Sequence, residues 1–192
     1  MVFDQFKDIV RHNVDLMLLN YKPRRKKSSG SFSELLFNNF SQQSLNIRIG
    51  SVLEKSWKQL LFQINDVDVL DYDNIAGHQI DLMFIYRDDC FYLESKNNIN
   101  LDTEKTLATY NKVKFMEKYL KDNFTKYNTY SKVLSNRYHS FQFMKHYKKP
   151  LDKDTLFGYG DFFLLFDEQV SIKNWETFFN NVGKHILEEV VF

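Results

Sequence analysis

Two acidic residues and a lysine near the middle of the chain could hold a divalent cation and position a water molecule. Asp81 lies in the largely apolar segment 77–84, and Glu94 and Lys96 lie in the segment 91–96. Residues two apart on a strand point to the same face of a sheet, so Glu94 and Lys96 are expected to be neighbours. Two converging carboxylates suit Mg²⁺, and an adjacent ammonium can stabilise negative charge. Together these are the parts for metal-assisted hydrolysis of a phosphodiester.

A hairpin is expected to position these side chains. In the segment 79–86, Ile80, Leu82 and Phe84 alternate with Asp81, Met83 and Ile85, and the segment 90–96 comes after it, beyond a short Arg-Asp-Asp turn. This pattern predicts two antiparallel strands joined by a tight turn. With that turn, Asp81 is expected opposite Glu94 or Lys96, so both carboxylates and the ammonium would meet at one end of the hairpin.

The spacing of these residues resembles a known nuclease signature. Asp81, twelve intervening residues and then Glu94-Ser95-Lys96 resemble the motif of the PD-(D/E)xK nucleases, and an acid-x-Lys triplet occurs only once in the chain. Ile80 stands where a proline often precedes the first aspartate of that motif. Members commonly carry a further acidic residue on the preceding helix, and Glu54 fits that place. The resemblance covers roughly residues 45–140.

The resemblance implies both a fold and an activity. The segment 97–113 also resembles the segment after the motif in type II restriction endonucleases. The implied fold is an α/β restriction-endonuclease-like sandwich, with a central mixed sheet flanked by helices. The implied activity is Mg²⁺-dependent, sequence-specific cleavage of double-stranded DNA that leaves 5′-phosphate and 3′-hydroxyl ends. Asp81, Glu94 and Glu54 would then hold Mg²⁺, while Lys96 would position the attacking water. A single site cuts one strand, so a homodimer is expected.

Other interpretations of the same residues stay open. A nuclease of this fold could serve repair, recombination or a mobile element, and a non-catalytic DNA-binding module could share the fold. Asp81 could face water on an edge strand. Glu94 and Lys96 could form a surface ion pair of little energy. Glu54 and Lys58, four residues apart, could form an ion pair along a helix.

Basic and amide side chains near the motif suggest where DNA would lie. Two segments are basic: one holds Arg24 and Arg25, and the segment 126–149 interleaves lysines and arginine with aromatic residues. Basic side chains contact phosphates, and Asn side chains can hydrogen-bond adenine. In each segment the lysines and arginines could equally be solvated. The candidates for DNA contact are Arg24, Arg25, Asn97, Asn98, Asn100, Lys132, Arg137 and Lys145.

The remaining periodicities predict an α/β order with an N-terminal helical extension. Apolar residues at helical spacing predict helices, and period-two alternation predicts strands. We expect residues 1–44 to form the extension with its basic arm, and residues 45–192 to form the nuclease domain. Helices are expected at 3–20, 31–40, 46–64, 102–121 and from 171 onward; strands at 67–72, 79–86, 90–96 and 131–138; and 157–166 as a strand or a helix.

Composition bounds the class of protein. The chain has 192 residues, a net charge of +1 and one cysteine. A single cysteine excludes an internal disulfide and a multi-cysteine zinc cluster. No apolar run approaches the ~18 residues of a membrane span, so a cytoplasmic protein that does not enter a membrane is expected. Because the sequence lacks a Gly-rich phosphate loop, no organic cofactor is expected.

Overall fold

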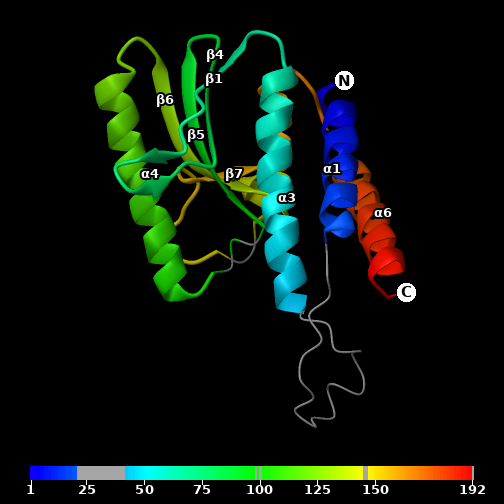
Figure 1. Cartoon of the computed structure of the whole chain (residues 1–192). Helices are drawn as coiled ribbons and strands as arrows, with labels where there is room; N and C mark the ends of the chain where they lie inside the picture. Colours follow the sequence, from blue (N-terminus) through cyan, green and yellow to red (C-terminus); the bar gives the residue numbers. More distant parts are fainter. Residues whose placement is uncertain (21–41, 98, 100, 145–146, 192) are drawn as a thin grey trace.

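The chain folds around a five-stranded mixed sheet, which is shown in Figure 1. The computed structural model describes residues 1–20, 42–97, 99, 101–144 and 147–191, with only the backbone of 42–46 and 190–191. The strand order is β1-β4-β5-β6-β7. Strand β4 runs antiparallel to its neighbours β1 and β5, and β5, β6 and β7 run parallel to one another. The bounds are Val67–Val69 (β1), Leu82–Tyr86 (β4), Asp89–Lys96 (β5), Asn128–Ser135 (β6) and Leu156–Gly158 (β7).

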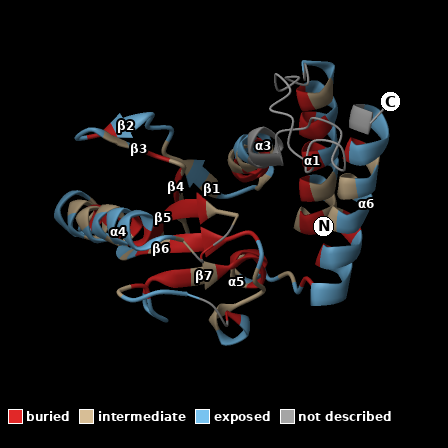
Figure 2. Cartoon of the chain, turned by 90° about the horizontal axis from the view of Figure 1, so that it is seen from below, coloured by how far each residue is buried: buried red, intermediate tan, exposed pale blue. Residues whose placement is uncertain are grey.

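Helices cover both faces of this sheet. Figure 2 shows α4 on one side of the buried strands, and α3 followed by α1 and α6 on the other. A small antiparallel ribbon of β2 and β3 lies outside the main sheet. Among the described residues, none of the helices is long and apolar enough to cross a membrane. The bounds are Val2–Leu19 (α1), Gln42–Gln63 (α3), Asn74–Ile75 (β2), His78–Gln79 (β3), Thr103–Asn123 (α4), Phe141–Phe143 (a 3₁₀ turn), Tyr159–Leu164 (α5) and Ile172–Val191 (α6).

Each face of the sheet has its own apolar core. On the α4 side, Val113 and Met116 pack against Tyr92 and Val133 of the strands. On the other side, strand residues such as Phe84 join side chains of α1, α3, α5 and α6. A strand whose two faces are both covered carries apolar residues at consecutive positions rather than at every second one. The run of apolar residues in β5 therefore results from its place at the centre of the sheet.

Stacked aromatic rings join α1 to the rest of the molecule. The ring centroids of Phe6 and Trp57 are 4.1 Å apart, and those of Phe6 and Trp175 are 5.6 Å apart. Trp175 in turn stacks on Tyr159 at 4.0 Å. Aromatic pairs at these separations contribute energy beyond the apolar area that they bury. Helix α1 thus shares a core with α3, α5 and α6, whereas the division into residues 1–44 and 45–192 stays a prediction.

Several sequence expectations are confirmed. The mixed sheet flanked by helices is present, and β4 and β5 form the predicted hairpin. The register pairs Leu82 with Leu93, which places Asp81 opposite Glu94. Asp102 caps α4 by accepting a hydrogen bond from the backbone N–H of Lys105. The predicted helix at 31–40 lies outside the described residues.

Other expectations need correction. The strand predicted at 79–86 is divided, because β3 ends at Gln79 and β4 begins at Leu82. The strand predicted at 131–138 covers 128–135 instead. The segment 157–166 supplies both a strand and a helix, β7 and α5.

We predict that replacing Phe6 by Ala lowers the free energy of unfolding of the whole chain by about 3–5 kcal/mol, because the substitution leaves a cavity against Trp57. Phe6 is fully buried, whereas Leu19 on the same helix is 81% exposed, so Leu19→Ala is the matched control. Denaturant unfolding followed by circular dichroism measures both. An unchanged main transition in Phe6→Ala would show that α1 is not part of the cooperative core.

Candidate active site

Asp81 lies just before β4, and the returning strand fixes its carboxylate. The backbone N–H of Ser95 donates a hydrogen bond to Asp81 Oδ2 at 2.9 Å. The Asp81 side chain is only 8% exposed. The alternative in which Asp81 faces water is therefore wrong. The hydrogen bond also fixes the distance between Asp81 and Glu94, the residue directly before Ser95.

Glu94 is a buried carboxylate with three polar contacts. Its Oε1 lies 2.6 Å from Lys96 Nζ, and its Oε2 lies 2.5 Å from Lys112 Nζ. The Tyr92 hydroxyl donates to the same Oε2 at 2.5 Å. Tyr92, Glu94 and Lys96 share one face of β5, as residues two apart on a strand must. Because Glu94 is only 5% exposed, the surface-pair interpretation of Glu94 and Lys96 is wrong.

Lys112 is a site residue that the sequence analysis missed. It reaches Glu94 from α4 and lies 4.0 Å from Asp81 Oδ1, with only 15% of its side chain exposed. Its ammonium group therefore lies near both carboxylates. A signal was present in the sequence: Lys112 comes one helical turn after Thr109 and directly precedes Val113, at the edge of the buried face of α4. A lysine at such a position is unusual unless an acidic partner is buried with it.

Burial and mutual charge shift the protonation of the site. Burial raises the pKa of Asp81 to about 7, and the negative charge of Glu94 adds to this effect. Burial also opposes ionisation of Glu94, but Lys96 and Lys112 outweigh it and lower the pKa of Glu94. The carboxylates of Glu94 and Asp81 raise the pKa of Lys96 against the effect of its burial. The site thus resists holding two negative charges without a cation.

Glu54 faces the same region from α3. Burial raises the pKa of Glu54. The positive charge of Lys96 opposes this effect, and the negative charge of Glu94 adds to it. Glu54 and Asp81 line a common cavity of about 550 Å³. Lys58, the proposed partner of Glu54 along the helix, forms an ion pair with Asp71. Glu54 therefore lies near the site, and its role as a metal ligand stays a prediction.

The two carboxylates fit a hard divalent cation. Lys112 Nζ, which is 2.5 Å from Glu94 and 4.0 Å from Asp81, shows that a positive charge is accommodated between them. Within the described part of the chain, no three His, Cys, Asp or Glu side chains are grouped to hold a metal. Mg²⁺ commonly takes one or two carboxylates and completes its shell with water and phosphate oxygens. Asp81 and Glu94 could supply those carboxylates if Lys112 were displaced, and the metal stays a prediction.

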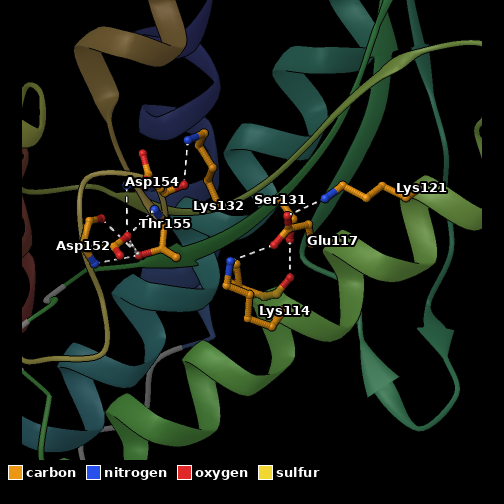
Figure 3. Close-up of polar contacts among 9 residues, drawn as sticks. Lys114, Glu117, Lys121, Ser131, Lys132, Asp152, Asp154 and Thr155 are labelled. Carbon is orange, nitrogen blue, oxygen red and sulfur yellow. Dashed lines mark hydrogen bonds and ion pairs between the residues drawn. The ribbon is translucent and has the colours of Figure 1, made fainter.

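The predicted DNA contacts divide into three groups. Asn97 and Arg137 line one cavity at the ends of β5 and β6. Lys132 lies elsewhere: Figure 3 shows it at the turn around Asp152, where its Nζ donates to the carbonyl of Asp154 at 2.8 Å. This contact uses Lys132 within the fold, so its predicted role in binding DNA is less well supported. The other candidates, Arg24, Arg25, Asn98, Asn100 and Lys145, lie outside the described residues.

Comparisons with known proteins identify no relative of this chain. The chain matches no protein-family model, no curated protein and no solved structure. Membership of the PD-(D/E)xK family therefore stays a prediction, carried by the residues and their geometry.

We predict that Asp81 makes the metal-free protein less stable as the pH rises from about 4 to about 7. The native carboxyl, with its pKa raised to about 7, keeps its proton in this range, whereas the unfolded chain loses it near the ordinary aspartate value. The native state then binds more protons, so stability falls with rising pH. Unfolding measured in EDTA at several pH values should show a shallower decline for Asp81→Asn. Identical slopes in both proteins would contradict the raised pKa.

We also predict that Lys112→Met lowers the free energy of unfolding by about 2 kcal/mol at pH 8, because it removes a charged hydrogen-bond partner from buried Glu94. Lys118→Met is the matched control, since Lys118 is an exposed lysine on the same helix. Urea denaturation compares the two variants with the wild type. Equal stability of Lys112→Met and Lys118→Met would show that the Lys112–Glu94 contact contributes little.

Proposed function

We propose that the protein is a Mg²⁺-dependent endonuclease acting on DNA, with Asp81, Glu94 and Lys96 at its active site. One observation carries the proposal: two neighbouring carboxylates are buried at the end of the β4–β5 hairpin, and a lysine lies 2.6 Å from one of them. Structural ion pairs also occur inside proteins. However, burying two acids side by side is costly, and such costs are concentrated at functional sites.

Each residue has a role that its contacts make feasible. Asp81 and Glu94 would hold Mg²⁺, which lowers the pKa of a bound water and offsets phosphate charge. Lys96, on the same face of β5 as Glu94, would orient the attacking water and stabilise the charge that develops on the phosphate. Lys112 keeps Glu94 paired when no metal is bound. Glu54, which lines a cavity with Asp81, would support the metal from the α3 side.

The architecture supports the finer assignment as well. A mixed sheet with an antiparallel hairpin at its centre, parallel β6 and flanking helices is consistent with a restriction-endonuclease-like fold. From the resemblance of the motif we propose sequence-specific cleavage of double-stranded DNA that gives 5′-phosphate and 3′-hydroxyl ends. We also propose a homodimer, because a single site cuts one strand. A nuclease of repair, recombination or a mobile element would use the same residues on a substrate defined by its structure.

One observation favours a second candidate, a non-catalytic DNA-binding module. Lys96 and Lys112 already neutralise Glu94, so the cluster could be stable without a metal. In such a protein Asp81 and Lys96 would be dispensable for DNA binding. The two candidates therefore differ in what a substitution at either position does.

We predict that Asp81→Asn and Lys96→Met each slow DNA cleavage by at least about 10²-fold, since each removes a group that acts on the transition state. The assay incubates purified protein with long unmethylated duplex DNA in Mg²⁺ or EDTA, with Lys118→Met as the control that keeps activity. Discrete bands that require Mg²⁺ indicate a sequence-specific enzyme, and a smear indicates a nuclease without sequence specificity. Intact DNA with folded wild-type protein would contradict a nuclease of either kind.

A further inference from the structure

A large cavity lies at the edge of the sheet where β5, β6 and β7 end, on the side of α3 and α6. It measures about 1030 Å³ and is lined by residues that come directly after three strands: Asn97 after β5, Arg137 and Tyr138 after β6, and Tyr159 after β7. Ligands of open α/β sheets bind beyond the carboxyl ends of parallel strands. Asn97 follows Lys96, but consecutive strand residues point to opposite faces of a sheet. The cavity therefore lies on the side of α3 and α6, whereas Lys96 lines a separate cavity with Glu94 and Lys112 on the side of α4.

The lining combines aromatic, amide and charged side chains, and the charged ones include Glu176 as well as Arg137. Aromatic rings, including Tyr138 and Phe143, offer surfaces for stacking. The amides of Asn97 and Asn180 can donate and accept hydrogen bonds, and Arg137 supplies a positive charge at the rim. Rings that stack, amides that pair with polar edges and a guanidinium for phosphate are the groups by which proteins bind unpaired nucleotides. The volume is also large enough for a ligand of that size.

Buried hydrogen bonds hold the cavity wall in place. The amide nitrogen of Asn136 donates to Asn97 Oδ1 at 2.7 Å and to Ser95 Oγ at 3.1 Å. Its amide oxygen accepts from Trp57 Nε1 at 2.8 Å, and its backbone oxygen accepts from Trp175 Nε1 at 3.1 Å. Side chains held in this way lose little entropy when a ligand binds. The wall is thus preformed, and through Ser95 it is linked to the hydrogen bond that holds Asp81.

We propose that this cavity binds one unpaired nucleotide of a DNA strand. The inference rests on the proposed function, which supplies the class of ligand, a DNA strand. A base within a duplex is stacked on both sides and shows only its edges in the grooves, so it cannot enter. The bound nucleotide must therefore come from a single strand, or be turned out of the helix.

The test measures binding without cleavage. Fluorescence anisotropy in EDTA compares a short single-stranded oligonucleotide with a strand of the same length that lacks every base. The wild type should bind the intact strand about tenfold more tightly than the strand without bases, as expected for the loss of one stacked base. Equal binding of both strands, or no binding of either, would overturn the proposal.

Substitutions locate the effect in the cavity. Asn180 is an exposed residue of α6 that lines the cavity, so Asn180→Trp should narrow the cavity and abolish the difference between intact and base-lacking strands. Thr177→Trp, at another exposed position of α6, is the matched control and should retain the difference. Phe143, which is 46% exposed, can be changed to Ala with little risk to folding and should weaken binding of the intact strand only. A difference that persists in Asn180→Trp would also overturn the proposal.

The binding test and the cleavage test can fail independently of each other. If the wild type discriminates between the strands but cuts no DNA, the nuclease proposal fails and the nucleotide site stands. If the wild type cuts DNA but binds both strands equally, the cavity proposal fails and the nuclease proposal stands.

Discussion

The burial of two carboxylates side by side is the constraint on which the rest of the site depends. Asp81 and Glu94 face each other across the β4–β5 hairpin, and both side chains are less than a tenth exposed. Like charges so placed cannot both ionise without a nearby cation. Lys96 and Lys112 meet this need in the metal-free protein, and a divalent cation would meet it more strongly. The same constraint explains why burial and the charge of Glu94 raise the pKa of Asp81.

One buried amide joins the strand that carries Glu94 and Lys96 to two helices. Asn136, at the end of β6, joins β5, α3 and α6 by hydrogen bonds to Ser95, Trp57 and Trp175. A buried amide that satisfies its polar atoms adds specificity, because any displacement leaves an unpaired donor or acceptor. The stacked rings around Trp57 and Trp175 pack α3 and α6 into the same core. Asn136 therefore connects the aromatic core to the strand that carries the polar site.

The sequence predicted the hairpin and its three polar residues because both depend on local patterns. Period-two alternation and a short turn set the register that brings Asp81 opposite Glu94. Lys112 and Asn136 were not predicted because their roles depend on packing between segments distant in sequence. Lys112 meets Glu94 only because α4 crosses the face of β5, and Asn136 meets Trp57 across 79 residues. The role of Lys132 could not be predicted for the same reason, since its partner Asp154 is 22 residues away.

The most direct test of the proposed metal site is the binding of Mn²⁺, a paramagnetic substitute for Mg²⁺, measured by electron paramagnetic resonance at pH 8. Asp81 and Glu94 are both ionised at that pH in the presence of a divalent cation, since metal binding displaces the carboxyl proton. We expect the wild type to bind at least one Mn²⁺ per chain. Asp81→Asn should lose this binding, whereas Asp122→Asn, at an exposed position near the end of α4, should retain it. Equal binding by the wild type and Asp81→Asn, or no binding by the wild type, would contradict a metal site built on these two carboxylates.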